Sequence, residues 1–227
     1  MTQIHVVIAA GGAGLRYGTQ QKKQFLLWDG KSLLLHAVDF FLGYPGVQQI
    51  VVVLPQDELL NFAHNNTLVR CVVGGTSRAE SVKNGVLALQ HVQDVDCVLV
   101  HDAARPNLSE ALVDRVVASV CEHGAAIPTL AVTDTLKQVH DDQIVKTLDR
   151  SQMRVAQTPQ GARYSLFQQI YEKVDLDLAR VTDEAMLLEQ GGIAVNWVEG
   201  DKTNIKVTTP LDLTWLEFLK QNDEECK

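Results

Sequence analysis

The sequence predicts an α/β protein with a doubly wound, mostly parallel sheet and a β-arm that protrudes from it. Several short runs of almost wholly apolar residues are typical of strands that are buried on both faces of a parallel sheet. These runs are 4–10, 49–54, 68–73, 96–100 and 125–132. Segments with helical character separate the runs, and this alternation indicates β-α-β units. Residues 133–161 instead alternate polar and apolar side chains around a turn at 140–142, which predicts a β-hairpin arm.

Length, charge and cysteine content limit the class of protein. The chain has 227 residues, which suits one domain over 1–227 with an arm at 133–161. A formal net charge of −8 argues against a nucleic-acid or anionic membrane surface. No apolar run approaches the roughly 20 residues that a membrane span requires. The four cysteines contain no C-x-x-C pair, so we expect reduced thiols in a cytoplasmic protein.

The first apolar run ends in a glycine-rich loop. Its small residues are Ala9, Ala10, Gly11, Gly12 and Gly14. Glycines let the backbone turn sharply and expose N–H groups that bind an anion. Arg16, Lys22 and Lys23 follow, so a phosphate on this loop would meet positive charge. The alternative interpretation is a glycine-rich turn beside surface lysines.

Two known phosphate-binding loops do not match this stretch. The dinucleotide fingerprint G-x-G-x-x-G begins at Gly12 and Gly14, but the third glycine, Gly18, is one residue too late. The nucleoside-triphosphatase loop requires Gly-Lys-Ser/Thr, which does not follow the first run. A dehydrogenase and a P-loop enzyme are therefore excluded.

Because doubly wound sheets bind ligands beyond the carboxyl ends of their strands, the residues after the other runs are candidates. Ser77 and Glu80, after the third run, have the spacing of a capping box and predict a helix start. Gly75 and Ser81 are placed to contact a base or ribose, or only to cap that helix.

The fourth run is followed by His101-Asp102-Ala103-Ala104-Arg105. Asp102 is placed to hold Mg²⁺ or a sugar hydroxyl beside two small residues. His101 at such a position is more often structural than a base. Arg105 is placed either to bind a phosphate or to brace Asp102.

The remaining elements follow from periodicity and turn signals. Expected helices cover 32–42, 57–64, 109–123 (capped by Ser109), 165–174, 183–190 and a last segment entered through Thr209-Pro210. Late strands are expected at 193–198 and 204–208. The arm, about 30 residues long, has few apolar side chains and little core of its own. We therefore expect it to pack on another subunit.

Six short motifs occur in one order along the chain. They are Ala9-Ala10-Gly11 with Arg16 and Lys23-Gln24, Gly75 with Arg78-Ala79-Glu80-Ser81, His101 to Pro106, Asp134-Thr135 through Thr158-Pro159-Gln160, Thr182-Asp183-Glu184-Ala185, and Asn204-Ile205-Lys206-Val207-Thr208. In this combination the sequence resembles the 2-C-methyl-D-erythritol 4-phosphate cytidylyltransferases of the non-mevalonate isoprenoid pathway, over nearly the whole chain.

The resemblance implies a Rossmann-like sheet of the nucleotidyltransferase type. It also implies a reaction in which a phosphate oxygen of 2-C-methyl-D-erythritol 4-phosphate attacks the α-phosphorus of CTP and pyrophosphate leaves. Mg²⁺ or another divalent cation is the implied cofactor. Charge builds on the α-phosphoryl oxygens in such a displacement, and Arg16 and Lys23 are implied to stabilise it.

The resemblance also implies the remaining site residues. The CTP site would be lined by Ala9, Ala10, Gly11, Gly12, Gly75, Ser81 and Ala103, with Asp102 on Mg²⁺ or the ribose. Lys206 would position the polyol phosphate together with Arg105, Thr135, Arg150 and Thr158. In this family the arm reaches across a homodimer, so Thr135 and Arg150 are expected to serve the partner's site.

Two departures from the family pattern leave alternatives open. Lys22 stands where the family usually has proline, and the glycine loop is one residue longer than usual, so Lys22 and Lys23 both remain candidates for the catalytic lysine. A ribitol-5-phosphate cytidylyltransferase would use the same chemistry, although Ala103-Ala104 and the motif at 182–185 favour methylerythritol phosphate. A catalytically silent nucleotide-binding dimer is the alternative of another class. The presence of the catalytic cations counts against it.

Overall fold

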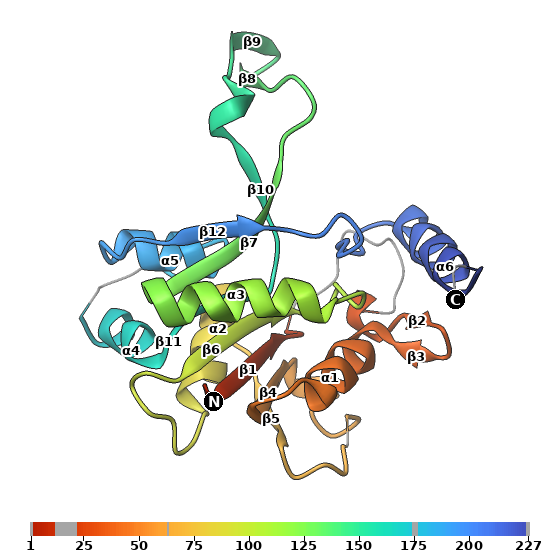
Figure 1. Ribbon diagram of the computed structural model, residues 1–227, viewed down its shortest axis with the longest axis vertical. Helices are drawn as coiled ribbons and strands as arrows, with labels where there is room; N and C mark the ends of the chain where they lie inside the picture. Colours follow the sequence, from red (N-terminus) through yellow and green to blue (C-terminus); the bar gives the residue numbers. More distant parts are fainter. Residues whose placement is uncertain (1, 12–21, 63, 174–176, 226–227) are drawn as a thin grey trace.

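An eight-stranded mixed sheet forms the centre of the computed structural model, which describes residues 2–11, 22–62, 64–173 and 177–225 (Figure 1). The strands are β1 (Ile4–Ala9), β4 (Val47–Leu54), β5 (Val69–Val73), β6 (Cys97–Asp102), β7 (Ala125–Ala131), β10 (Arg154–Ala156), β11 (Gln160–Arg163) and β12 (Asn196–Glu199). The order is β10-β7-β11-β6-β1-β4-β5, and β12 pairs with β7. The pairs β6-β1, β1-β4, β4-β5 and β12-β7 are parallel, while β11 lies antiparallel between β6 and β7.

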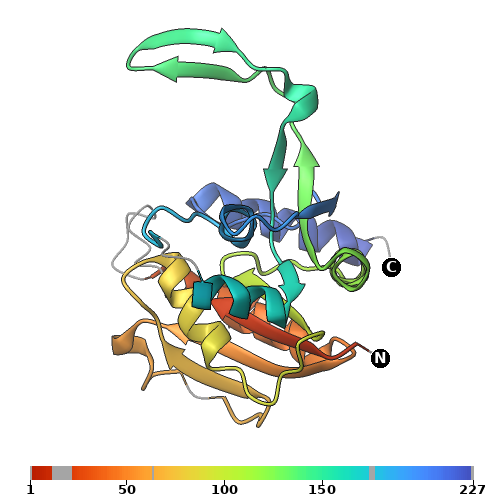
Figure 2. The ribbon, with the colours of Figure 1, turned by 90° about the vertical axis from the view of Figure 1, so that its left-hand side faces the viewer.

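Helices cover both faces of this sheet (Figure 2). One face packs against α1 (Leu33–Gly43) and α3 (Glu110–His123), and the other against α2 (Arg78–Leu87), α4 (Tyr164–Lys173) and α5 (Glu184–Gln190). Successive side chains of a strand point to opposite faces, so Val6 and Ile8 of β1 enter the first core and Val7 enters the second. Both faces are buried, which explains the continuous apolar run and confirms the predicted doubly wound, mostly parallel sheet.

A smaller core lies beside the sheet. It joins α6 (Pro210–Glu225) to the hairpin of β2 (Leu27–Trp28) and β3 (Lys31–Ser32). Its buried members are Trp28, Leu33, Val207 and Leu216. Val207 is fully buried there, so this core holds the segment that carries Lys206. No helix in the described part of the chain is long and apolar enough to cross a membrane.

Three predicted helix starts are confirmed by their caps. The side chains of Ser32, Ser77 and Asp183 accept hydrogen bonds from backbone N–H groups three residues later. Ser109 is the N-cap residue of α3, as expected, but its side chain makes no capping hydrogen bond. The Ser109 hydroxyl instead donates to Oδ2 of Asp201 at 2.8 Å, because the loop before α3 packs against that carboxylate.

The β-hairpin of the arm projects away from the body of the molecule (Figures 1 and 2). It consists of β8 (Lys137–His140) and β9 (Gln143–Thr147), with the turn at the predicted residues. The excursion is shorter than the expected 133–161, because β10 and β11 return to the main sheet. β10 pairs with β7, and β11 pairs with both β6 and β7.

Several predicted elements differ from the structure. The expected helix at 57–64 is replaced by one 3₁₀ turn, η3 (Gln56–Glu58), although residue 63 lies outside the described residues. β6 covers residues 97–102 instead of the predicted 96–100, because its pairing with β1 continues to Asp102. β12 begins at 196 instead of 193. The expected strand at 204–208 is coil, because its hydrogen bonds go to loops: Asn204 Nδ2 donates to the Thr158 carbonyl and the Val207 N–H to the Ala104 carbonyl.

Candidate active site

A cavity of about 490 Å³ lies at the carboxyl ends of β1 and β6 and the start of α2. Most of the predicted site residues line it: Ala9, Ala10, Gly11, Lys23, Gly75, Ser81, Asp102, Ala103 and Lys206. These residues come from segments far apart in the chain, and the sheet brings them to one edge. Gly12 and Arg16 lie outside the described residues.

The wall formed by the loop before α2 is fixed by one hydroxyl. Ser81 Oγ accepts the N–H of Gly75 at 3.0 Å and donates to the carbonyl of Ser77 at 2.8 Å. A Cβ on Gly11 would lie 3.0 Å from this oxygen, and a Cβ on Gly74 2.8 Å from it. A side chain at Gly74, or at Gly11 after β1, would therefore crowd this hydroxyl, and Ser81 has a structural role besides its position in the wall.

Glu80 stabilises the same loop from the other side. Its carboxylate accepts the N–H and the hydroxyl of Thr76, both at 2.7 Å. A side chain on Gly75 would collide with that of Glu80. Ser77 caps α2, and Ser77 and Arg78, at the start of this helix, both line the cavity. The positive end of a helix at this place favours a bound anion.

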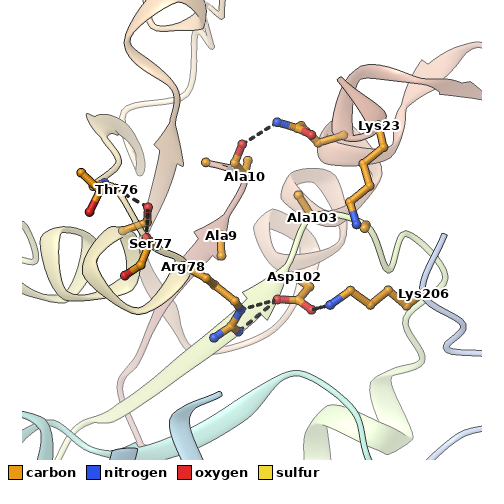
Figure 3. Close-up of a pocket in the computed structure, with 14 residues that line it drawn as sticks. Ala9, Ala10, Lys23, Thr76, Ser77, Arg78, Asp102, Ala103 and Lys206 are labelled. Atoms are coloured by element: carbon orange, nitrogen blue, oxygen red, sulfur yellow. Dashed lines mark hydrogen bonds and ion pairs between the residues drawn. The ribbon is translucent and has the colours of Figure 1, made fainter. Parts of the chain in front are cut away.

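The Asp102 carboxylate is bonded to two cations at the cavity, Arg78 and Lys206 (Figure 3). Its Oδ1 accepts hydrogen bonds from Arg78 Nε at 3.1 Å and Nη2 at 3.0 Å, and its Oδ2 accepts one from Lys206 Nζ at 2.6 Å. Burial alone would raise the pKa of this carboxyl, but the charges of Arg78 and Lys206 hold its pKa well below the usual range. Asp102 is therefore an anion at the cavity.

A buried hydrogen-bonded chain fixes the backbone behind Asp102. The carbonyl of Arg105 can only accept, so His101 Nε2 donates to it at 3.0 Å. Burial lowers the pKa of His101 to about 4, so the ring is neutral and its Nδ1 accepts from the Thr158 hydroxyl at 3.0 Å. The same hydroxyl accepts the N–H of Asp102 at 3.1 Å. His101 is structural, as expected.

Two residues expected on the substrate lie elsewhere. Thr158 belongs to this buried chain and is not among the residues that line the cavity. The guanidinium of Arg105 donates to the carbonyls of Asn204 at 2.8 Å and Ala156 at 3.5 Å. Arg105 therefore braces the segment that carries Lys206, and it is not among the residues that line the cavity.

The structure distinguishes the two candidate lysines. Gln24 lies in the 3₁₀ turn η2 (Lys23–Phe25), and its amide donates to the carbonyl of Ala10 at 2.7 Å (Figure 3). This bond holds the turn against the end of β1, and Lys23 lines the cavity. Lys22 is not among the lining residues. Its Nζ lies 2.5 Å from Asp57 and 3.3 Å from Glu58.

The structure adds cavity residues that the sequence analysis did not select as site residues. Gln24, Thr76, Ser77, Arg78 and Ala104 all line the cavity. Arg78 also bonds Glu184, with Nη1 to Oε1 at 2.8 Å and Nη2 to Oε2 at 3.0 Å. A signal existed, because both residues belong to the motifs quoted above and a buried carboxylate such as Asp102 requires a cationic partner.

Within the described residues, no group of three or more His, Cys, Asp and Glu side chains is arranged to hold a metal ion. Asp102 is the one carboxylate among the described residues that line the cavity. Mg²⁺ commonly binds through one or two carboxylates together with substrate phosphates and water. The donor set therefore fits a magnesium ion that arrives with a nucleotide, and does not form a cage of its own.

The arm residues are not part of this cavity within one chain. Thr135 and Arg150 are exposed on the arm, and the Arg150 guanidinium donates to the carbonyl of Thr133. Neither residue lines the cavity.

Comparisons with known proteins identify relatives over nearly the whole chain. The family model described as 2-C-methyl-D-erythritol 4-phosphate cytidylyltransferase matches residues 4–222. The chain is 36% identical over 231 residues to the protein of that name from Syntrophus aciditrophicus, with 97% of both chains covered. It is 39% identical over 217 residues to that from Haemophilus influenzae, with 95% of both covered. The crystal structure of the Francisella tularensis cytidylyltransferase of the same name superposes with a TM-score of 0.82 at 32% identity, over 96% of this chain and 99% of that one.

Proposed function

This chain belongs to the 2-C-methyl-D-erythritol 4-phosphate cytidylyltransferase family, and we propose that the family's reaction takes place in the cavity at the carboxyl ends of β1 and β6. The reaction joins CTP to 2-C-methyl-D-erythritol 4-phosphate and gives 4-diphosphocytidyl-2-C-methyl-D-erythritol and pyrophosphate. The observation that carries the assignment to this cavity is the cluster of Lys23, Arg78, Asp102 and Lys206 around a wall of small residues.

The small residues make room for the nucleotide. Ala9, Ala10 and Gly11 bring the backbone close to the ligand, while the start of α2 faces its phosphates. Gly75, Ser81 and Ala103 leave space for the ribose and base. Only short side chains occur at these positions, so the backbone itself can approach the nucleotide.

The cations act on the charge that develops during transfer. An oxygen of the polyol phosphate forms a bond to the α-phosphorus while the bond to the bridging oxygen breaks, and the electron pair leaves with pyrophosphate. Lys23 stabilises the α-phosphoryl oxygens and Lys206 holds the attacking phosphate in line. Arg16, which lies outside the described residues, is proposed as a second stabiliser.

Asp102 is the residue that would hold Mg²⁺ on the nucleotide. Mg²⁺ would neutralise phosphate charge there, and the ionised carboxylate of Asp102 supplies one oxygen ligand. Both carboxylate oxygens are bonded to cations, so the carboxylate would share or exchange a partner when nucleotide and metal bind.

The arm is proposed to complete the site of a partner in a homodimer. Exposed apolar residues on the hairpin support this proposal, because Val139, Ile144 and Val145 are each more than half exposed. In a dimer, Thr135 and Arg150 of one chain would contact the polyol phosphate bound to the other. A cytoplasmic location is part of the same proposal, supported by cysteine spacing that indicates no disulfide framework.

Pyrophosphate release tests the proposed function and its nearest alternative. The protein would be incubated with Mg²⁺ and CTP, and with either methylerythritol 4-phosphate or ribitol 5-phosphate. UTP and ATP would then replace CTP. We expect release with CTP and methylerythritol phosphate alone. Release with ribitol phosphate would keep the mechanism and change the substrate, whereas no release with any pair would support a silent nucleotide-binding dimer.

A further inference from the structure

A second carboxylate lies behind the cavity, where it is bonded to the guanidinium of a residue that lines the cavity. Glu184 is 2% exposed and is not among the residues that line the cavity. It accepts two parallel hydrogen bonds from Arg78, at 2.8 and 3.0 Å. The remaining edge of the same guanidinium donates two bonds to Oδ1 of Asp102. Arg78 therefore bridges a buried carboxylate and the carboxylate of the site.

This geometry fixes the orientation of Asp102. A guanidinium is planar and presents its N–H groups at fixed angles, so two bonds to Glu184 determine where the other N–H groups point. Those groups bond only one oxygen of Asp102. The other oxygen, Oδ2, is left to face Lys206.

The position of Glu184 is itself held by the sheet. Gln160, which is buried in β11, accepts the N–H of Ala185 at 3.0 Å and donates to Oδ2 of Asp183 at 3.0 Å. Asp183 in turn caps α5, the helix that begins with Glu184. The start of α5 is therefore bonded to β11, a neighbour of the strand that ends in Asp102.

A buried ion pair of this kind is weak evidence for a role in stability. Replacing such a pair with apolar side chains of similar size is often neutral or stabilising, whereas removing one partner is strongly destabilising. The bidentate geometry gives directional control that an apolar contact cannot give.

We propose that Glu184 is a positioning residue for the transferase reaction, acting through Arg78 to aim the Asp102 carboxylate at Lys206 and the substrates. The inference rests on the proposed function. It concerns a residue that contacts neither the cavity nor, by this geometry, the reacting atoms.

Two variants, one that removes Arg78 and one that removes both Arg78 and Glu184, distinguish an effect on catalysis from an effect on stability. In Arg78→Met the buried carboxyl of Glu184 loses its hydrogen-bond partner, so we expect a lower melting temperature and a fall in kcat/KM for the polyol phosphate of about 100-fold. In Arg78→Met/Glu184→Met the unpartnered carboxyl is gone. We expect the melting temperature to return near that of the wild type while kcat/KM stays low.

The single variant Glu184→Gln tests the same idea without deleting the side chain. Its amide nitrogen would face a guanidinium donor, so one of the two parallel bonds is lost. We expect kcat/KM to fall about 10- to 100-fold. In a background of Arg78→Met, the change Glu184→Gln should lower kcat/KM no further, because the residue acts through Arg78.

Asp96→Asn is the matched control. Asp96 is buried and pairs with His5 at 3.3 Å, immediately before the start of β6, whereas Asp102 ends that strand. We expect this variant to lose stability and to keep kcat/KM within about threefold of the wild type, when assayed below its melting temperature.

The outcomes separate this inference from the proposed function. Recovery of kcat/KM together with stability in the double Met variant would overturn the positioning role and leave the proposed function standing. Additive losses from Arg78→Met and Glu184→Gln would do the same. Absence of transferase turnover in the wild-type protein would overturn both.

Discussion

Lys206 Nζ lies 2.6 Å from Oδ2 of Asp102, although 104 positions separate the two residues in the sequence. Three interactions bring them together. β6 carries Asp102 to the edge of the sheet, the small core around Val207 holds the segment of Lys206, and Asn204 bonds that segment to the loop at Thr158. This pair places an anion and a cation side by side at the cavity.

Lys206→Met should lower kcat/KM for the polyol phosphate by about 100- to 1,000-fold, because it removes the cation proposed to align the attacking phosphate. Steady-state kinetics with the polyol phosphate varied at saturating CTP measures the effect. Lys202→Met, an exposed lysine of the same segment, is the matched control and should stay close to wild type. Equal losses in both variants would contradict a specific role for Lys206.

Lys23→Ala should lower kcat by about 100- to 1,000-fold while CTP binding survives, because its charge is needed most in the transition state. Lys22→Ala should lower kcat by less than about tenfold, because Lys22 is bonded to Asp57 and Glu58 instead of lining the cavity. Single-turnover kinetics and calorimetric CTP titration separate the two effects. A Lys22→Ala variant as impaired as Lys23→Ala would reverse the assignment.

Arg150→Ala should raise the KM for the polyol phosphate more than the KM for CTP, if the arm serves the partner's site as proposed. Mixing it with Lys23→Ala then tests the arrangement directly. In an equimolar mixture about half of the dimers are mixed and each has one intact site, so about one quarter of the wild-type activity should return. No recovery at any mixing ratio, with subunit exchange verified by mass, would argue that the arm acts within its own chain.

Gly85→Ala should destabilise the protein by about 1–3 kcal/mol, despite the higher helix propensity of alanine. The added Cβ would lie 2.5 Å from Val7 Cγ1 and 2.8 Å from Val53 Cγ2, where α2 packs against β1 and β4. Urea unfolding measures the change in free energy. Gly43→Ala in α1 is the control, because it meets nothing within 4 Å, and it should be neutral or slightly stabilising. Equal stability of the two variants would contradict the packing argument.

His101 should make the protein less stable in acid. Burial lowers its pKa from 6.5 to about 4, so the folded state binds the proton more weakly than the unfolded state. The stability from the neutral ring is therefore complete above pH 6.5 and is lost as the pH falls toward about 4, by at most about 3 kcal/mol. Urea midpoints across this range should fall less steeply in His101→Gln. His5, whose pKa burial also lowers, accounts for part of the remaining slope.

The elements that could be predicted from the sequence depend on local patterns. Apolar runs predicted the parallel strands because the sheet is covered by helices on both faces, and the capping box of Ser77 and Glu80 predicted the start of α2 because a cap acts within three residues. The short motifs predicted most of the cavity wall for a related reason. Residues that follow parallel strands must meet at one edge of the sheet.

The tertiary structure decided every feature whose partners are distant in the chain. Residues 204–208 alternate like a strand, but their hydrogen bonds go to residues 158 and 104, which no local pattern reveals. Lys22 and Lys23 are adjacent in the sequence, but only Lys23 lines the cavity. Lys22 instead forms ion pairs with Asp57 and Glu58 of η3.

Arg105 and Thr158 had the chemistry of substrate ligands, yet they form the buried support behind Asp102. Conversely, the sequence showed Glu184 only as part of a motif, and the structure shows that it is bonded to Arg78, which lines the cavity. Local periodicity in the sequence was enough to predict which residues follow each strand and stand at the edge of the sheet, because it shows where strands begin and end. Only the tertiary structure decided which of them face the cavity, because that depends on hydrogen-bond partners up to about 100 positions away.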